Sequence, residues 1–289
     1  MIDLHLHTTA SDGRSSPEDL VRASLAARLH TIAVTDHDTV AALDRAAAAC
    51  DAAGIAWVPG IEITAIRDEV DVHILGYFID HRAPRLTDFL DEQIADRRRR
   101  VREMIDRLAE IGISIDARAV LDGHRGVDPR WVGRPMLARA LVRAGHVRTP
   151  REAFDLYLGE GGAAWVARRA PSPADVVSLI HDLGGLASLA HPGLVGHDEW
   201  IAPMAADGLD ALEVFYSDHS PEMTAGYLGV ASGLGLGITG GSDYHGDPTH
   251  GPDRPGAVTL PEEMFTDLKK RLPAAPAPGP ASSSTRTAQ

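Results

Sequence analysis

Cysteine pairs, long apolar runs and an excess of positive charge are all missing from this sequence of 289 residues. The single cysteine, Cys50, can form neither an internal disulfide nor a cysteine-based zinc site, which suits a reducing compartment. Because no apolar run approaches the roughly 18 residues of a membrane span, we expect no membrane partner. The N-terminus also lacks the basic and apolar pattern of a signal peptide, so we expect a cytoplasmic protein.

Acidic residues outnumber basic ones, 41 to 28, which gives a formal net charge of −13. Proteins that wrap long nucleic acid usually present a basic surface, so this balance argues against such a partner and leaves room for a local anion site. One basic run, RRRRVR at residues 97–102, invites a nucleic-acid interpretation. Because acidic residues occur at neighbouring helical spacings, a solvated, charge-balanced helix face is favoured, although one arginine could reach over a site.

Short apolar runs alternate with helix-like stretches over residues 1–90, a pattern that builds a parallel sheet or a β/α barrel. A long amphipathic helix and further helical periodicity then replace the alternation, which returns after residue 170. The segment from Pro273 onward is rich in Pro, Ala and Ser and has no apolar periodicity. We therefore expect a barrel formed by residues 1–90 and 166–272, a helical insertion at 91–165 and a disordered tail at 273–289.

Histidine and acidic residues gather at the carboxyl ends of the predicted strands. Because a strand alternates faces with period two, His5 and His7 project to the same side, and Asp12 follows in the next loop. This edge is where β/α enzymes place their sites. The same placement recurs along the chain at His37, Glu62, His73, His191, Asp243 and His245.

Each of these residues taken singly has a structural explanation. A strand-end histidine is more often a hydrogen-bonded structural residue than a ligand, which is the favoured interpretation for His37 or His73 alone. An aspartate before a helix is usually a cap. All nine together are hard to explain by capping, because each would bury a polar group without a common partner. A shared metal cluster supplies that partner.

Nitrogen and oxygen ligands without a thiolate suit zinc, manganese or iron, and the set is too rich in imidazole for magnesium or calcium alone. Such a cluster lowers the pKa of a bound water to about 7 and clamps the oxygens of a phosphoryl group. The pattern therefore predicts hydrolysis of a phosphate ester.

Six motifs resemble, in order, those of the PHP (polymerase and histidinol phosphatase) metal-dependent phosphoesterases. They are HLHTTASDG, TDHD, GIE, VDVHILGY, AHPG and GGSDYHG. The resemblance covers residues 1 to about 272. It is greatest to the subgroup that hydrolyses nucleoside 3′,5′-bisphosphates and nucleotides, through the helical insertion and the segment EVFYSDHSPE. It implies an α/β fold, a distorted (β/α)7 barrel with an inserted helical subdomain, and three divalent ions, often manganese, iron or zinc.

The resemblance also implies how the ligands are divided among the ions. The first ion would be held by His5, His7, Glu62 and Asp243. Glu62 would bridge to a second ion held by His73 and His191. The third ion would be held by Asp12, His37 and His245.

Three further residues are candidates for contact with the substrate. Arg134 lies in GRPM, where the family usually has Gly-Arg-Pro-His, and is a predicted phosphate clamp. Met136 replaces that histidine and cannot usefully hydrogen-bond a phosphate, which leaves the substrate preference open. His219 is a candidate acid for the leaving group or a phosphate ligand, or else a residue of the cap before a helix. Arg14 is a candidate phosphate contact or a surface residue beside a turn.

We hypothesise a phosphatase that releases phosphate from a small nucleotide, a nucleoside 3′,5′-bisphosphate or monophosphate, by attack of a metal-bridging hydroxide. Asp243, His219 and Arg134 are its predicted catalytic residues. The enzymatic alternatives are a 5′→3′ exonuclease on short oligonucleotides and a histidinol phosphate phosphatase. A non-catalytic metal-binding module predicts gaps in the ligand set, and the sequence shows none. No motif specifies the oligomeric state.

Overall fold

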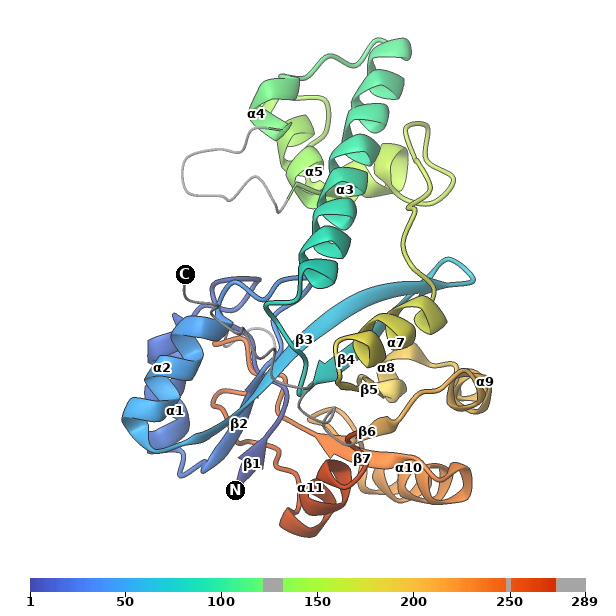
Figure 1. Cartoon of the computed structure of the whole chain (residues 1–289). Coiled ribbons are helices and arrows are strands. Elements are labelled where there is room, and N and C mark those ends of the chain that lie inside the picture. Colours follow the sequence, from blue (N-terminus) through green and yellow to red (C-terminus); the bar gives the residue numbers. More distant parts are fainter. Residues whose placement is uncertain (122–131, 248–250, 274–289) are drawn as a thin grey trace, which may run out of the picture. The chain divides into compact units, whose positions relative to one another are not determined.

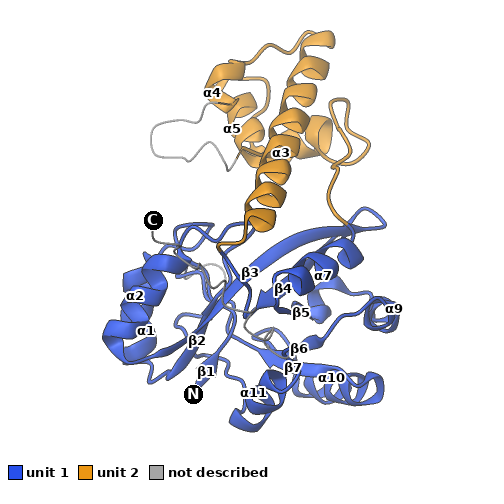
Figure 2. Cartoon of the chain, in the orientation of Figure 1, with its two compact units in different colours: residues 1–81, 172–289 blue, residues 82–171 orange. Residues whose placement is uncertain are grey.

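The structure is a computed structural model that describes residues 1–121, 132–247 and 251–273. The chain forms two compact units, the first from Met1–His81 with Ser172–Gln289 and the second from Arg82–Pro171 (Figure 2). The predicted helical insertion at 91–165 lies within the second unit. The predicted tail at 273–289 lies outside the described residues from residue 274 onward. Among the helices of the described ranges, none is both long and apolar enough to cross a membrane.

The first unit is a nearly closed barrel of seven strands that neighbour one another in sequence order (Figure 1). Its strands are β1 (Ile2–Asp3), β2 (Thr31–Val34), β3 (Ala56–Arg67), β4 (Val70–Tyr77), β5 (Leu186–Leu189), β6 (Ala211–Phe215) and β7 (Gly237–Gly240). The backbone N–H of Leu4 donates to the carbonyl of Gly240 at 3.2 Å, which joins the first strand to the last. The predicted distorted (β/α)7 barrel is confirmed.

The distortion of the barrel originates at β4, which pairs antiparallel with both β3 and β5, whereas the other neighbouring strands are parallel. Two residues separate β3 from β4, and both have positive φ, 49° at Asp68 and 65° at Glu69. Two positive φ angles are typical of the tight hairpin turn that matches strand twist. The chain therefore reverses here instead of crossing over through a helix.

Some helices of the first unit begin at a serine that caps them. The Ser16 side chain accepts the N–H of Asp19 ahead of Pro17, and Ser172 forms a reciprocal capping box with Asp175. The helices are α1 (Pro17–Ala26), α2 (Leu43–Ala53), α7 (Pro173–Asp182), α8 (Pro192–Val195), α9 (Ile201–Ala206), α10 (Pro221–Leu234) and α11 (Glu262–Lys269), with a 3-10 turn at Asp198–Trp200. These helices bury apolar side chains against the strands.

The second unit has a hydrophobic core of its own. It consists of α3 (Pro84–Glu110), α4 (Ala117–Leu121), α5 (Arg134–Arg143), α6 (Pro150–Ala153) and a π-helical turn (Phe154–Leu158). Its core is formed by buried side chains such as Met104, Leu108 and Leu137. On α3, Arg99 pairs with Asp96 at 2.6 Å and with Glu103 at 2.7 Å. These pairs support the charge-balanced interpretation of the arginine run.

Asp3 fixes the start of the barrel to the segment that follows β7. Its buried carboxylate accepts the N–H of Ser242 at 2.9 Å, the hydroxyl of Ser242 at 2.6 Å and the N–H of Gly256 at 2.7 Å. The backbones approach so closely that a Cβ at Gly241 would lie 2.5 Å from the Cβ of His5. Asp3 thus holds the start of the barrel next to the segment that follows β7.

Replacing Gly241 with alanine should lower the free energy of unfolding by about 1–3 kcal/mol, because the added methyl group overpacks the closure. Urea denaturation measures the change. Gly229→Ala on α10 is the matched control, since a Cβ there meets nothing within 4 Å outside its own helix turn. The control should gain about 0.5–1 kcal/mol. Equal stability of Gly241→Ala and the wild type would contradict the close approach.

Candidate metal centre

The barrel brings all nine predicted ligands to one edge. Most follow the carboxyl end of a parallel strand or its loop: His5, His7, Asp12, His37, His191, Asp243 and His245. Glu62 lies within β3. His73 lies near the start of β4, opposite Thr64 in the register. Because β4 runs antiparallel, its start lies at the same edge as the ends of the parallel strands.

Glu62 is the centre of the cluster and is almost fully buried. Each of its carboxylate oxygens lies near several imidazole nitrogens. Oε2 lies 3.2 Å from ring nitrogens of His5, His7 and His37. Oε1 lies 2.8 Å from Nδ1 of His73 and 3.1 Å from Nε2 of His191.

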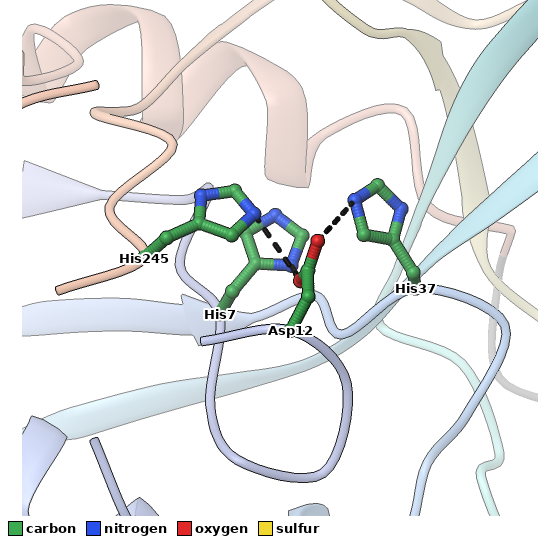
Figure 3. Close-up of side chains that lie close together, drawn as sticks. All are labelled: His7, Asp12, His37 and His245. Atoms are coloured by element: carbon green, nitrogen blue, oxygen red, sulfur yellow. Dashed lines mark ion pairs between the residues drawn. The ribbon is translucent and has the colours of Figure 1, made fainter. Parts of the chain in front are cut away.

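Two aspartates extend the cluster from Glu62. Oδ1 of Asp243 lies 3.0 Å from Nε2 of His7 and 3.3 Å from Nε2 of His5. Asp12 reaches from its loop between two rings, 3.2 Å from Nε2 of His245 and 3.8 Å from Nε2 of His37 (Figure 3). All nine side chains thus belong to one network in which neighbouring nitrogen and oxygen atoms lie within 3.8 Å.

The ligand atoms form three overlapping groups, each with atoms within 4.8 Å of one another. One contains the four residues predicted for the first ion. A second contains the three predicted for the third ion together with His7. The remaining group joins His37, Glu62 and His73, whereas the prediction joined Glu62, His73 and His191. The geometry therefore supports metal binding, and the number of ions and their division among the ligands remain predictions.

Buried ring nitrogens test whether the residues fit a metal. Nδ1 and Nε2 of His7, Nδ1 of His73 and Nδ1 of His191 are buried and have no hydrogen-bond partner of adequate geometry among the described residues. The rings of His7 and His245 stack with centroids 4.1 Å apart. Buried polar atoms are costly without partners, and imidazole and carboxylate are the donors that zinc, manganese and iron accept. The residues fit a divalent-metal centre.

Protonation in the cluster also fits this role. Burial lowers the pKa of His37 to about 4, so its ring is neutral near pH 7. Burial opposes the charge of Glu62, but the surrounding imidazole rings outweigh it and hold the pKa of Glu62 well below its usual range. Burial also opposes protonation of His7, yet Asp243 and Glu62 raise its pKa to about 10. A divalent cation binding there would displace that proton.

Two proposed ligands have a backbone conformation that is rare outside glycine. The φ angle is 26° at His191 and 56° at Asp243. Such conformations cost of order 1–3 kcal/mol and persist where the surrounding structure determines them. His191 lies two residues after β5 and its ring reaches Glu62, and Asp243 lies three residues after β7 and its carboxylate reaches His5 and His7.

The other acids of the TDHD motif hold loops. Asp36 accepts the N–H of Thr8 at 2.7 Å and the hydroxyl of Ser11 at 2.6 Å, which shapes the loop that carries Asp12. Asp38 accepts the N–H of Thr64 at 2.9 Å. These carboxylates place ligand-bearing segments through backbone and hydroxyl contacts.

The candidate substrate residues have partners of their own. His219 donates from Nδ1 to the carbonyl of Val214 at 2.9 Å and accepts the N–H of Gly193 at Nε2, at 3.2 Å. The guanidinium of Arg14 pairs with Asp247. Arg134 is the first residue of α5 in the second unit, with its guanidinium 5.8 Å from the centre of the Phe154 ring. Their roles toward substrate remain proposals.

Glu213 and Tyr216 lie in the segment EVFYSDHSPE, but they are not among the residues predicted for the site. Glu213 is fully buried in β6 and lies 2.9 Å from Nδ1 of His5. The Tyr216 hydroxyl donates to Oδ2 of Asp243 at 3.0 Å. A carboxylate inside the apolar run ALEVF was the available signal, because a charge in a buried strand requires a partner.

Comparison with known proteins agrees with this site. The PHP domain model matches residues 3–92. A 5′-3′ exoribonuclease of Haemophilus influenzae is 33% identical over 250 residues, which cover 84% of this chain and 89% of that protein. A 3′,5′-nucleoside bisphosphate phosphatase of Chromobacterium violaceum is 32% identical over 284 residues, 94% of this chain and 97% of that one.

A solved structure extends the agreement to the fold. A protein of Bifidobacterium adolescentis, described as a metal-dependent phosphoesterase, superposes with a TM-score of 0.75 at 31% identity and covers 95% of this chain and 97% of its own. The resemblance in the motifs is thereby confirmed. The chain belongs to the PHP family, and it is a metal-dependent phosphoesterase.

Addition of Mn²⁺ should stabilise the protein, by about 2.7 kcal/mol when the ion is present at one hundred times its dissociation constant. Asp243→Asn should lose much of this gain, and phosphate release with it, because a carboxylate between His5 and His7 is removed. Urea denaturation with and without Mn²⁺ measures the gain. Asp267→Asn, exposed on α11, is the control and should keep it. A full gain in Asp243→Asn would exclude this carboxylate as a ligand.

Proposed function

We propose that the protein removes a phosphate monoester from a small nucleotide, a nucleoside 3′,5′-bisphosphate or a nucleoside monophosphate. The nine-residue cluster around Glu62 carries this proposal, because it assembles imidazole and carboxylate ligands for several divalent ions at one point. Similarity to the bisphosphate phosphatase of Chromobacterium violaceum along 94% of the chain supports the substrate class. We also propose three ions, of manganese, iron or zinc, and a cytoplasmic location.

Residues around the cluster hold the proposed metal ligands in place. Divalent ions supply an acidified water and offset the charge of a phosphoryl group when they are bound. Tyr216 holds Asp243 through its hydroxyl, which leaves Oδ1 of that carboxylate directed toward His5 and His7. Asp36 and Asp38 keep the loops of Asp12 and His37 in place. The cluster therefore rests on contacts made by the surrounding residues.

Protonation of the leaving group is the proposed role of His219. In the structure its Nε2 accepts the N–H of Gly193, so the ring carries its proton on Nδ1. To donate from Nε2, the ring must be protonated there and release Gly193. The Arg14 guanidinium is mostly exposed and pairs with Asp247. It is a proposed phosphate contact, and to bind phosphate it must release Asp247.

A second candidate is a 5′→3′ exonuclease acting on short oligoribonucleotides. The observation that favours it is the 33% identity to the exoribonuclease of Haemophilus influenzae over 84% of the chain. The two activities differ in the bond that breaks. A monoesterase releases inorganic phosphate, whereas the exonuclease breaks an internucleotide phosphodiester and releases a nucleoside monophosphate. The net charge of −13 disfavours long strands but permits short ones.

A substrate panel separates these activities. Protein loaded with manganese, iron or zinc should release inorganic phosphate from a nucleoside 3′,5′-bisphosphate with a kcat/KM at least tenfold above that for histidinol phosphate. Chromatography of the products and a phosphate assay measure both outcomes, and the Asp243→Asn variant controls for contaminating phosphatases. Release of mononucleotides from 5′-phosphorylated trinucleotides, with no phosphate from the bisphosphate, would replace the proposal with the exonuclease.

Arg134 remains a proposed phosphate ligand on the basis of its Gly-Arg-Pro motif. Arg134→Ala should raise KM for the preferred nucleotide about tenfold or more, since a charge-assisted bidentate contact is worth about 1.5–3 kcal/mol. The metal content should not change. Arg139→Ala, exposed on the same helix, is the matched control. Steady-state kinetics measure the effect, and an unchanged KM in Arg134→Ala would remove this residue from the site.

A further inference from the structure

Glu213 is a charged side chain in the interior of an apolar strand. It lies in β6 between Leu212 and Val214, and its side chain is 0% exposed. Burying a carboxylate is expensive unless each oxygen has a hydrogen-bond partner. The contacts of its two oxygens therefore indicate what the residue does.

The two oxygens of Glu213 contact two different metal-ligand residues. Oε1 lies 2.9 Å from Nδ1 of His5, across 208 positions of sequence. Oε2 accepts the backbone N–H of His191 at 2.7 Å. His5 follows β1 and His191 follows β5, so one carboxylate joins two separate segments of the barrel edge.

The contact with His5 fixes how that ring presents itself. With Nδ1 donating to Glu213, the other nitrogen, Nε2, is directed at the centre. It lies 3.2 Å from Oε2 of Glu62 and 3.3 Å from Oδ1 of Asp243. A carboxylate behind a ligating histidine selects the tautomer and the orientation of the ring, and increases its basicity.

The contact with His191 acts on the backbone. His191 has φ 26° and ψ 61°, a conformation that a non-glycine residue rarely adopts. The hydrogen bond from its N–H to Glu213 helps to hold this conformation, in which Nε2 lies 3.1 Å from Oε1 of Glu62. Glu213 therefore acts on one ligand through its ring and on the other through its main chain.

We infer that Glu213 is a positioning residue that sets His5 and His191 together, and thereby couples two of the metal sites. The inference rests on the proposed metal centre, in which His5 serves the first ion and His191 the second. Glu213 itself need touch neither an ion nor the substrate. Its loss should weaken both of these ions at once, whereas loss of a single ligand should weaken chiefly the ion it holds.

Glu213→Gln tests this role because glutamine has the same shape but only one acceptor oxygen for two N–H groups. The matched control lies just before the same strand. Oδ2 of Asp210 accepts the N–H of Ala187 at 2.8 Å and faces Nε2 of His181 at 2.8 Å, away from the nine ligands. Asp210→Asn therefore disturbs the same kinds of contact without touching the centre.

The measurements are metal content after dialysis against graded chelator, the visible absorption of the Co²⁺-loaded protein, and urea denaturation of the metal-free protein. Glu213→Gln should bind two ions 10–100-fold more weakly and should shift the Co²⁺ spectrum. Asp210→Asn should match the wild type in ion affinity and in the Co²⁺ spectrum, even if its urea denaturation midpoint is lower. Wild-type affinity and spectrum in Glu213→Gln, or an equal loss in Asp210→Asn, would overturn the inference.

Glu213→Asp is the second variant, and it covers the case in which the glutamine variant does not fold. It keeps the charge but withdraws the carboxylate by one methylene. A positioning role therefore predicts weaker ion binding, whereas a purely electrostatic role predicts no change in ion binding. Unchanged affinity in Glu213→Asp would overturn positioning. If the wild-type protein binds no ion, both the proposed metal centre and the positioning role of Glu213 are wrong. Binding without phosphate release would overturn only the proposed function.

Discussion

The site depends on one buried carboxylate, that of Glu62, whose two oxygens lie within 3.2 Å of ring nitrogens from five histidines. Glu62 alone cannot neutralise five protonated rings in a buried space, although Asp243 and Glu213 offset part of the charge at His5 and His7. Five neutral rings would leave buried nitrogens without partners, as those of His7 and His73 show. Divalent cations resolve both difficulties, because they take up the lone pairs of neutral rings and are attracted by the carboxylate. The metal centre is thus the arrangement that this crowding of rings favours.

The fold meets this constraint through its irregular features. The hairpin at Asp68 and Glu69 reverses β4, and the reversal brings His73 to the edge where the parallel strands end. Carboxylates outside the nine then place the ligand segments. Asp3 closes β1 against the segment after β7, and Asp36 shapes the loop before α1. Loops that follow strands have few regular hydrogen bonds of their own, so these side-chain contacts supply the order that a metal site requires.

The sequence predicted what depends on local periodicity. The alternation of an expected strand predicted His5 and His7 on one face, and both rings do reach Glu62, although β1 ends at Asp3 and the two residues lie in the segment after it. The strand-end rule predicted Asp12 and Asp243 at this edge, whereas β3 continues past Glu62 to Arg67. Contacts between distant segments have no such period. Glu213 meets His5 across 208 positions, and nothing in the sequence near either residue specifies that partner. The hairpin before β4 was equally hard to predict, because neither Asp68 nor Glu69 is a glycine that would mark a positive φ.

Chemistry and substrate choice are encoded in different residues of this chain. Both reactions attack the phosphorus of a phosphate ester, a monoester in a bisphosphate and a diester at an internucleotide bond, and one cluster of metal ligands suits both. Identities of 32% and 33% to a phosphatase and an exoribonuclease agree with this, because relatives of similar identity are named for each of the two reactions. Discrimination must come from groups that contact the rest of the substrate. Met136 stands where the family usually has a histidine. Its side chain packs against the core of the second unit, and unlike a histidine it cannot usefully hydrogen-bond a phosphate. A methionine in that packing offers a phosphate no hydrogen bond, so the GRPM motif of this chain keeps one charged side chain, that of Arg134, and its contact with phosphate is a proposal.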